Sequence, residues 1–336
     1  MSTPDAAGGM ALSRRALLAP NLRASVVLLA VAVVGAALPG LIGSALLQTL
    51  LTQAVINAVL ATGVGVMIRQ NGLVSFGHAA FFGLAAYIVA MATARHLMSA
   101  ELAAVLAIAV PVVLAFLLGL AILRISGVAF SMLTLAVAQA LYELMLRWRS
   151  LANGDDGIAA DLPHRLFGAD LTLFQQPASM FVVCWLVLML VLAALGLLVR
   201  SHFGTLTLAI RENEERARFI GYETLLPRAV VYAISAGIAA LGGVLFVFYN
   251  GFVTPDALYW SLSGEALVMA VIGGTRAIWG PALGAVIFFL FKDAAGNYTE
   301  HWPAIIGATL IVVTVLLPRG ASGSLGMLVQ RLTRRQ

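Results

Sequence analysis

The side chains that could bind a solute or move a proton are few, and they lie inside long apolar stretches. A polar or ionisable group in such a stretch is costly unless it faces a protein partner or water. His78 and Glu143 are therefore candidates for a transport pathway or for hydrogen bonds between helices, and for His78 the interhelical hydrogen bond is the expected role. The polar residues within apolar stretches are Gln53, Asn57, Ser75, His78, Ser131, Thr134, Gln139, Glu143 and Glu265.

The sequence holds no arrangement typical of an enzyme or a metalloprotein. It contains no Gly-x-x-x-x-Gly-Lys-Ser/Thr loop for nucleotide phosphates. The one cysteine, Cys184, cannot form a disulfide within the chain, and no Cys/His cluster has the spacing of metal ligands. We expect no catalytic residue, no metal and no cofactor bound by this chain. The apolar stretches also lack the series of acidic residues that an ion pump needs.

Composition identifies the surroundings of these residues. Hydrophobic residues make up 61% of the 336 positions and charged residues only 10%, whereas a soluble domain carries about 25% charged residues. Such a chain in water would expose large apolar patches, so lipid is the expected solvent. The net charge of +5 comes from arginines between apolar runs. That placement is typical of loops bordering a membrane and does not indicate nucleic-acid binding.

Apolar stretches of about 20 residues can cross the 30 Å core of a bilayer as helices. The expected fold is an all-α polytopic membrane protein of about ten transmembrane helices, with eight as the lower bound. The region 259–291 forms either two short crossings broken near Gly273, Gly274 and Arg276 or one long distorted helix. The predicted spans are 24–44, 48–68, 73–94, 101–123, 127–147, 178–199, 229–249, 259–275, 277–291 and 302–318.

The basic residues predict the orientation. With ten spans and a cytoplasmic N-terminus, 15 basic residues fall inside and 5 outside, which favours N-in and C-in. The expected parts are a cytoplasmic tail over 1–23, one transmembrane domain over 24–318 and a basic cytoplasmic tail over 319–336. A short motif at Arg14 and Arg15 resembles a twin-arginine signal, but further spans follow it, so we expect an uncleaved first helix.

Two polar segments, 149–177 and 200–228, are longer than the other connections. The predicted topology places the first on the outer face and the second in the cytoplasm. Glycine, asparagine and aspartate in the first segment favour turns, and it is either a solvated turn or part of an outer vestibule that receives substrate. Its most turn-rich part is Asn153, Gly154, Asp155, Asp156 and Gly157.

The second polar segment has a broken apolar stripe at helical spacing. Glu212 and Arg216 are four residues apart and can pair on one helix face. Glu214 and Arg218 have the same spacing, and Gly221 is placed to end the helix. A short amphipathic helix of this kind lies on lipid headgroups or docks in a groove of a partner protein. Its mixture of charges favours the protein partner, since anionic lipid would select a basic face.

Two glycine-rich segments occupy comparable places in the two halves of the chain. Residues 71–83 begin the third predicted span, and residues 273–285 begin the ninth. Small residues let helices approach closely in lipid, and this role alone could explain them. Glycine-interrupted segments at corresponding positions also indicate an internal pseudo-repeat around a central pathway.

Four groups of motifs, spread over about residues 70–320, together resemble one known family. Their order and spacing resemble those of the LivM-like permeases of branched-chain amino acid ABC importers, the LivH/LivM permease family. The motifs are Leu73–Tyr87; Phe130–Tyr142 followed by Asn153–Gly157; Arg211–Gly221; and Trp279–Gly284 with Tyr298–Pro303 and Pro318–Gly320.

The resemblance implies a type II-like importer permease in the bacterial inner membrane. Its implied partners are a second, LivH-like permease, two ABC ATPases that use the ATP, and a periplasmic binding protein. Whether the permease core is a homodimer or a heterodimer stays open. The implied substrates are branched-chain or related hydrophobic amino acids; the alternatives are urea, amides or aromatic acids, or an ion-coupled transporter.

The same resemblance assigns the 200–228 segment as the coupling loop seated on an ATPase. The expected coupling residues are Arg211, Glu212, Asn213, Glu215, Arg218 and Gly221. Combined with the polar positions above, it also suggests which residues line the substrate pathway. The expected pathway residues are Ser75, Phe76, His78, Thr134, Gln139 and Glu143.

Overall fold

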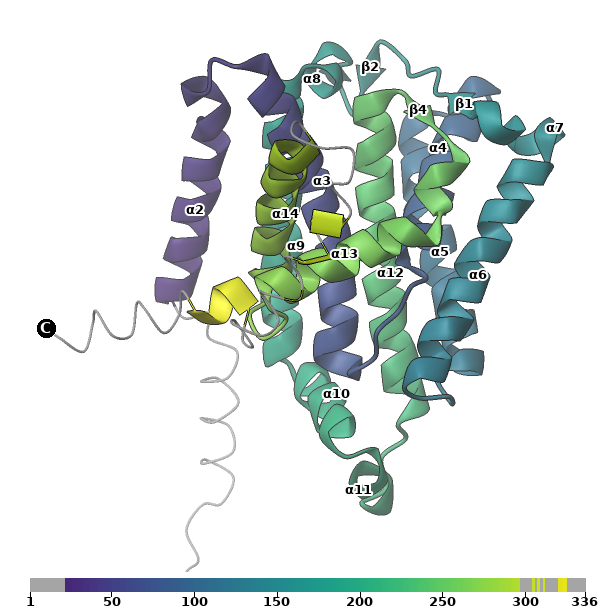
Figure 1. Cartoon of the computed structure of the whole chain (residues 1–336), viewed down its shortest axis with the longest axis vertical. Helices are drawn as coiled ribbons and strands as arrows, with labels where there is room; N and C mark the ends of the chain where they lie inside the picture. The colour runs from purple at the N-terminus through teal and green to yellow at the C-terminus, as the bar shows by residue number, and fades with distance from the viewer. Residues whose placement is uncertain (1–21, 297–303, 306, 309–310, 312–319, 325–336) are drawn as a thin grey trace, which may run out of the picture.

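The computed structural model describes residues 22–296, 304–305, 307–308, 311 and 320–324. Within these residues the chain is a bundle of long helices, as Figure 1 shows, and the predicted all-α membrane fold is confirmed. Most of the two predicted tails and most of the predicted tenth span fall outside the described residues. The long elements are α2 (Leu22–Leu41), α3 (Ala45–Val66), α4 (His78–Ala94), α5 (Ala100–Ile122), α6 (Val128–Arg147), α9 (Pro177–Arg200), α12 (Leu225–Asn250), α13 (Trp260–Gly273) and α14 (Gly280–Gly296).

These helices follow the first nine predicted spans in order. Five of the described helices are long and apolar enough to cross a membrane: α3 with its continuation to Asn71, α5, α6, α9 and α12. Shorter apolar helices cover Leu29–Leu41, α4 and α13. The region 259–291 forms two helices, α13 and α14, with a turn between them that begins at Gly274.

Local signals account for several helix ends. The Ser99 hydroxyl accepts a hydrogen bond from the Leu102 amide at 3.3 Å and caps the start of α5. Pro177 occupies the first turn of α9, where its missing N–H costs nothing. Gly251 ends α12 with a φ of +65°, a conformation that glycine adopts without strain.

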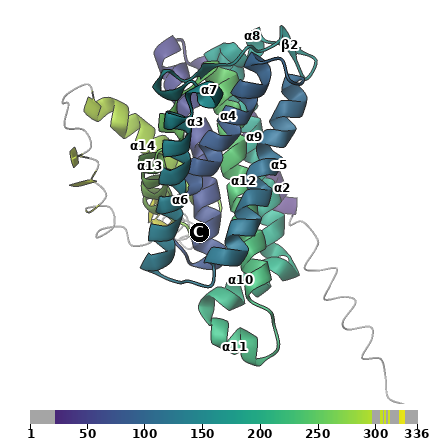
Figure 2. The ribbon, with the colours of Figure 1, turned by 90° about the vertical axis from the view of Figure 1, so that its right-hand side faces the viewer.

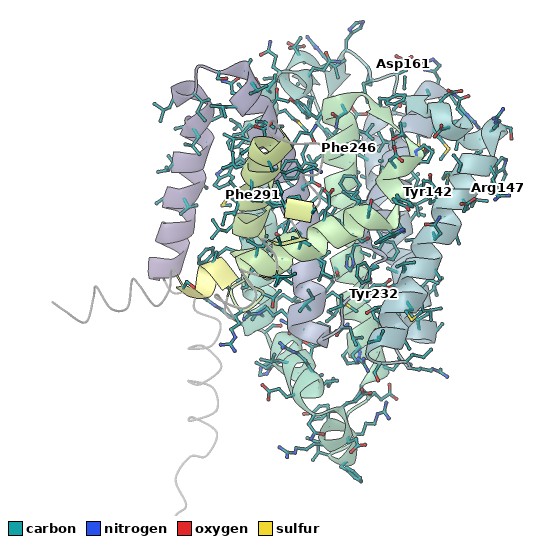
Figure 3. All side chains as sticks on the ribbon, in the orientation of Figure 1. Tyr142, Arg147, Asp161, Tyr232, Phe246 and Phe291 are labelled. Carbon is teal, nitrogen blue, oxygen red and sulfur yellow. The ribbon has the colours of Figure 1, made fainter. Side chains whose placement is uncertain are left out.

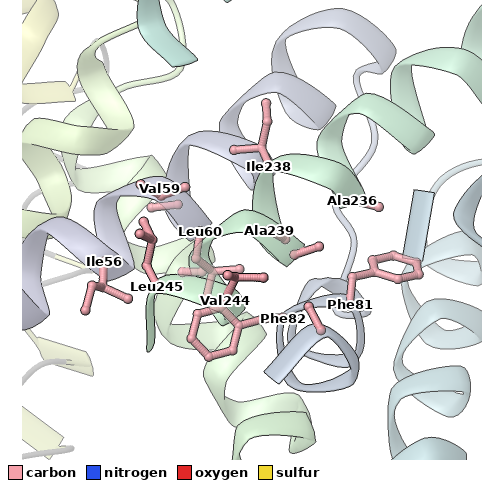
Figure 4. Close-up of a cluster of buried hydrophobic side chains, with 14 of the residues drawn as sticks. Ile56, Val59, Leu60, Phe81, Phe82, Ala236, Ile238, Ala239, Val244 and Leu245 are labelled. Carbon is pink, nitrogen blue, oxygen red and sulfur yellow. The ribbon is translucent and has the colours of Figure 1, made fainter. Parts of the chain in front are cut away.

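Helix α12 lies at the centre of the bundle and packs against α3, α4 and α5 (Figure 2). Small residues permit this close approach, since a Cβ on Gly243 of α12 would collide with the Phe82 carbonyl oxygen of α4. Around this contact, the three helices α3, α4 and α12 contribute a buried apolar cluster, shown in Figure 4. It includes Ile56, Val59, Leu60, Phe81, Phe82, Ala236, Ile238, Ala239, Val244 and Leu245.

The two long polar segments lie at opposite ends of the bundle (Figure 1), as the alternation of spans predicts. One end carries the helices α10 (His202–Glu212) and α11 (Glu214–Phe219); we call it the α10–α11 end. The opposite end, here the β1–β4 end, holds two short antiparallel pairs, β1 with β4 and β2 with β3. Its elements are α7 (Arg149–Ala152), η2 (Gly154–Asp156), β1 (Ile158–Ala159), β2 (Arg165–Leu166), β3 (Ala169–Asp170), α8 (Thr172–Gln175), β4 (Phe252–Val253) and η3 (Pro255–Leu258).

Both glycine-rich segments interrupt the helical structure at comparable points. Residues 72–77 are non-helical and lead into α4, and residues 274–279 are non-helical and lead into α14. Each interruption follows a helix that ends at a glycine-permitted turn, with Gly72 at a φ of +68° and Gly274 at +88°. This arrangement agrees with the internal pseudo-repeat that the sequence predicts.

Candidate functional site

The break before α4 is the most distinctive feature of the membrane-spanning part. Helix α3 continues into a π-helical turn, η1 (Met67–Asn71), and the chain then runs back into the bundle as a non-helical segment before α4 begins at His78 (Figure 1). We call residues 72–77 the re-entrant segment. Its backbone N–H and C=O groups cannot be satisfied by lipid, so other parts of the protein must provide their hydrogen-bond partners.

Helix α6 provides two of these partners. The Ser131 hydroxyl donates to the Val74 carbonyl oxygen at 2.7 Å. The Phe76 amide donates to the Thr134 hydroxyl at 3.1 Å, and Thr134 in turn donates to the Ser131 carbonyl oxygen at 2.9 Å. Two hydroxyl residues one turn apart on α6 therefore hold the re-entrant segment in place.

Further hydrogen bonds in and next to the segment come from the segment itself and from α13. The Ser75 hydroxyl accepts from the Gly77 amide at 3.2 Å. The Ser263 hydroxyl of α13 accepts from the Ala79 amide at 2.7 Å, in the first turn of α4. Ser75 and Ser263 are both fully buried. This hydrogen bond joins the start of α4 to α13 inside the bundle.

His78 joins α4 to α12. Its Nε2 atom lies 2.5 Å from the Ser235 hydroxyl oxygen, and the imidazole is fully buried. The ring also makes edge contacts with Phe81 and Tyr232, at centroid distances of 6.3 and 6.2 Å. This is the interhelical hydrogen bond expected from the sequence.

The six expected pathway residues divide into two groups. Ser75 and Phe76 belong to the re-entrant segment, His78 follows it directly, and Thr134 bonds to it. Gln139 and Glu143 lie further along α6. Glu143 pairs with Arg147 at 2.9 Å across one helical turn, and both side chains are substantially exposed.

In Figure 3, Tyr142 and Arg147 of α6 lie closer to the β1–β4 end than Tyr232 of α12 does. The Tyr142 ring contacts that of Tyr259, which precedes α13, at 5.0 Å between centroids. Gln139 is half-buried, and its Oε1 atom has no hydrogen-bond partner within the described residues. The structure therefore does not bring all six residues to one place.

One intramembrane ion pair was not predicted. The sequence places Lys292 just outside the ninth span, on the outer face, but α14 extends to Gly296 and includes it. Its Nζ atom lies 3.0 Å from Glu265 Oε1 on α13, and both side chains are about one-third exposed. Two opposite charges on neighbouring helices satisfy each other where either alone would be costly. The pairing of the two helices, which only the folded chain reveals, brings these residues together.

At the β1–β4 end, residues 153–157 form a tight turn. Asn153 has a φ of +62°, and its side-chain amide donates to the Gly157 carbonyl oxygen at 3.0 Å. A Cβ on Gly157 would collide with the Val253 carbonyl oxygen across the β1–β4 pair. Asp155 and Asp156 are exposed. The turn therefore presents two carboxylates outward from a fixed backbone.

At the α10–α11 end, the prediction of one continuous helix is wrong. Asn213 interrupts it, because its side-chain oxygen accepts a hydrogen bond from the Arg216 amide at 2.8 Å and starts a second helix. Glu212 and Arg216 consequently lie in different helices and lose the expected one-turn relationship. The six expected coupling residues are all exposed at this end: Arg211, Glu212, Asn213, Glu215, Arg218 and Gly221.

Two other expectations for this segment, the Glu214–Arg218 pair and the helix end at Gly221, are confirmed. Arg218 pairs with Glu214 across one turn of α11, at 2.6 Å. Gly221, with a φ of +90°, ends α11, where its amide and the next one donate to the last carbonyls of the helix. Beside it, Phe219 is 90% exposed and Ile220 is 70% exposed. The tip of this end is thus apolar.

Sequence comparisons place these features in a family. The family described as branched-chain amino acid transport system / permease component matches residues 46–314, well over half of the chain. The high-affinity branched-chain amino acid transport system permease protein LivM of Salmonella typhimurium LT2 is 24% identical over 80% of this chain and 68% of its own. LivM of Escherichia coli K12 is 23% identical over the same shares of the two chains.

Other relatives match about half of the chain. The permease protein LivH of the branched-chain amino acid system of Escherichia coli K12 is 29% identical over 47% of this chain and 50% of its own. The autoinducer 2 import system permease protein LsrC of Salmonella paratyphi B is 29% identical over 50% and 51%. No solved structure matches the chain. The match includes both glycine-rich segments, and the chain therefore belongs to the family of branched-chain amino acid transport system permease components.

Proposed function

We propose that this chain is the membrane-spanning subunit of an ATP-driven importer that carries branched-chain or related hydrophobic amino acids. The observation that carries the proposal is the family match over residues 46–314, which includes the re-entrant segment and the α10–α11 end. The chain itself holds no nucleotide-phosphate loop. We therefore assign ATP hydrolysis to two partner ATPase subunits, and no cofactor to this chain.

The α10–α11 end is the surface we assign to the ATPases. Phe219 and Ile220 are exposed on a short helix whose flanks carry charges of both signs. Exposed apolar side chains with a charged rim fit a groove on another protein. The exposed residues Arg211, Glu212, Asn213, Glu215 and Arg218, with the helix end at Gly221, surround this apolar tip.

The re-entrant segment is the part we assign to the substrate pathway. Irregular backbone at membrane depth is tolerated where it is buried in protein or lines a water-filled space, and broken helices of transporters place their binding sites there. Val74 and Phe76 are the partly exposed residues of the segment, whereas Ser75, His78 and Thr134 are buried. We assign Phe76 to the pathway, Ser75 and Thr134 to holding the backbone of the segment, and His78 to joining α4 to α12. Gln139 and Glu143 would line the same route nearer the β1–β4 end.

The remaining partners follow from the two ends. We assign the β1–β4 end, with exposed Asp155 and Asp156, to the periplasmic face and to a substrate-binding protein. We assign the N- and C-terminal ends to the cytoplasmic side of a bacterial inner membrane, and the excess of arginines in the connections on that side supports this orientation. The second permease of the complex is a LivH-like subunit or a second copy of this chain.

A different solute is the second candidate. The relative LsrC belongs to an autoinducer 2 import system, which shows that related permeases serve other substrates. Urea, amides and aromatic acids are further alternatives, and an ion-coupled transporter is the alternative mechanism. Within the described membrane-spanning helices, the Glu265–Lys292 pair already neutralises its own charges, which favours the ATP-driven mechanism over ion coupling.

Uptake into proteoliposomes tests the proposal. The vesicles hold this chain, its companion permease, the ATPases and the binding protein, and labelled leucine is the probe. Saturable uptake that requires both ATP and the binding protein is the expected result. Uptake of another solute under the same requirements would change the substrate and keep the mechanism. Uptake by this chain alone, driven by an ion gradient, would overturn the proposal.

A further inference from the structure

The π-helical turn η1 (Met67–Asn71) contacts the α10–α11 end through three consecutive residues. It connects α3 directly to the re-entrant segment. π-helical turns are rare and are frequent at functional sites. In this protein the turn stands between the surface assigned to the ATPases and the backbone assigned to the pathway.

Two of the three contacts reach α10. The Thr207 hydroxyl donates to Gln70 Oε1 at 3.0 Å, and both side chains are buried. The Arg211 guanidinium donates to the Arg69 carbonyl oxygen at 2.7 Å. Helix α10 is therefore held to η1 by one buried and one exposed hydrogen bond.

The third contact reaches α11 through the start of α12. Asn71 Nδ2 donates to the Arg228 carbonyl oxygen at 3.0 Å. The Arg228 guanidinium, only 8% exposed, pairs with Glu214 at 2.7 Å. The same carboxylate accepts from Arg218 at 2.6 Å and from the Thr224 hydroxyl at 2.9 Å. Glu214, at the start of α11, is thus fixed by three donors and linked to η1 through Arg228.

On its other side, η1 continues into one glycine-rich break and contacts the other. Asn71 is followed by Gly72, with a φ of +68°, and then by the re-entrant segment that ends at α4. Arg69 Nη1 lies 3.5 Å from the Thr275 carbonyl oxygen in the turn between α13 and α14. A displacement of η1 would therefore act on both glycine-rich breaks at once.

We propose that η1 transmits the movement of α10 and α11 to the re-entrant segment, with Gln70, Asn71, Glu214 and Arg228 as positioning residues. The inference rests on the proposed function, because it assumes that ATPases move this end. The buried links make α10, η1 and the start of α12 one body. The non-helical residues 72–77 are the element that can change conformation when that body moves.

The experiment follows the re-entrant segment directly. The full complex carries Phe76→Cys, and a membrane-impermeant maleimide measures its labelling rate without nucleotide and with vanadate-trapped nucleotide. Thr207→Val removes the hydroxyl that donates to Gln70, and Asn71→Leu removes the amide that donates to Arg228. The matched control is Thr205→Val, on the same helix, because the Thr205 hydroxyl bonds only to carbonyls of residues 201 and 202 in the described part of the chain.

The expected result is a labelling rate that changes with nucleotide when Phe76→Cys is the only substitution and when Thr205→Val is added to it. In the Thr207→Val/Asn71→Leu background that nucleotide response shrinks by roughly 2- to 30-fold, while ATPases still co-purify and hydrolyse ATP. Thr207→Ser, which keeps the hydroxyl, retains the response.

Three outcomes overturn the inference. The first is an unchanged nucleotide response in the Thr207→Val/Asn71→Leu background. The second is a complex with Phe76→Cys as its only substitution whose labelling ignores nucleotide. The third is loss of ATPase binding in the Thr207→Val/Asn71→Leu background, since Thr207 and Asn71 would then be needed for the ATPases to dock. Leucine uptake by the wild-type complex tests the proposed function separately.

Discussion

The Nε2 atom of His78 on α4 lies 2.5 Å from the Ser235 hydroxyl on α12. That hydroxyl also donates to the Gly63 carbonyl oxygen on α3 at 2.8 Å. Because a hydroxyl has one hydrogen, it must accept from His78, so the imidazole carries its proton on Nε2. A single serine therefore joins three helices at the centre of the bundle.

Replacing this serine should loosen the bundle. Ser235→Ala removes both hydrogen bonds, and interhelical hydrogen bonds in membranes contribute roughly 0.5–2 kcal/mol. We expect a lower midpoint of thermal unfolding for the purified protein in detergent. Ser261→Ala on α13, where the residue is exposed, is the matched control and should leave the midpoint unchanged. Equal midpoints for the two variants would show that the Ser235 bonds add nothing to stability.

Close packing between α4 and α12 makes a second prediction. An alanine Cβ at position 243 would collide with the Phe82 carbonyl oxygen, which is backbone and cannot rotate away. We expect Gly243→Ala to lower stability by about 1–3 kcal/mol, as overpacking does in well-packed cores. The yield of folded, monodisperse protein and its unfolding midpoint would measure the loss.

The control for this substitution is another helical glycine. At Gly196 of α9, nothing lies within 4 Å of an added Cβ. Gly196→Ala should be neutral or slightly stabilising, because alanine favours the helix more than glycine does. If Gly243→Ala behaved like Gly196→Ala, the helices would have to separate more easily than the structure indicates.

The helical fold was predictable because the length of an apolar run is enough to identify a membrane span. Apolar runs such as 101–123 and 178–199 correspond to α5 and α9 within a residue or two at each end. Glycine at position 221 likewise marked the end of α11 correctly. These features depend on residues close together in sequence, where local propensity and lipid decide the outcome.

Features set by distant contacts were missed. The break at Asn213 was missed for a different reason: asparagine followed by Glu214 and Glu215 is a local signal for a helix start, and the apolar stripe across it was given more weight. Lys292 and Glu265 meet only because α14 folds back on α13. Glu214 was expected to pair with Arg218 alone, and its second partner, Arg228, was not predicted. Glu214 and Arg228 carry opposite charges within the 200–228 segment, but only the folded chain shows that they pair.

The carboxylates of the β1–β4 end should matter for substrate delivery and little for assembly. Asp155 and Asp156 are exposed on a turn whose backbone is fixed by Asn153. We expect Asp155→Ala/Asp156→Ala to reduce binding-protein-dependent uptake while the complex purifies normally. Asp170→Ala, at another exposed carboxylate of the same end, is the control. Unchanged uptake in the double variant would leave the turn as a solvated connection only.

The orientation can be tested with cysteines at the two ends. Cys184 is fully buried, so it should label slowly. We expect Asp156→Cys to react with an impermeant maleimide on spheroplasts and Phe219→Cys to react only in inside-out vesicles, because the arginine-rich connections favour the cytoplasmic side. The reverse pattern would invert the assigned topology, and with it the assignment of both ends.

The apolar tip of α11 gives the sharpest test of ATPase docking. Phe219 is 90% exposed, and its side chain adds little to the fold of this chain. Phe219→Ser should therefore leave expression and unfolding unchanged, whereas burial of the ring in a partner groove is worth about 1.5–3 kcal/mol. We expect roughly a 10- to 150-fold loss of affinity for the ATPases, since each 1.4 kcal/mol is tenfold. Titration of the detergent-solubilised permease with purified ATPase measures the loss.

Phe219→Leu keeps most of the apolar area and should bind nearly as well as the wild type. If serine and leucine bind equally, the ring does not enter the interface, and the ATPases must dock elsewhere on the α10–α11 end.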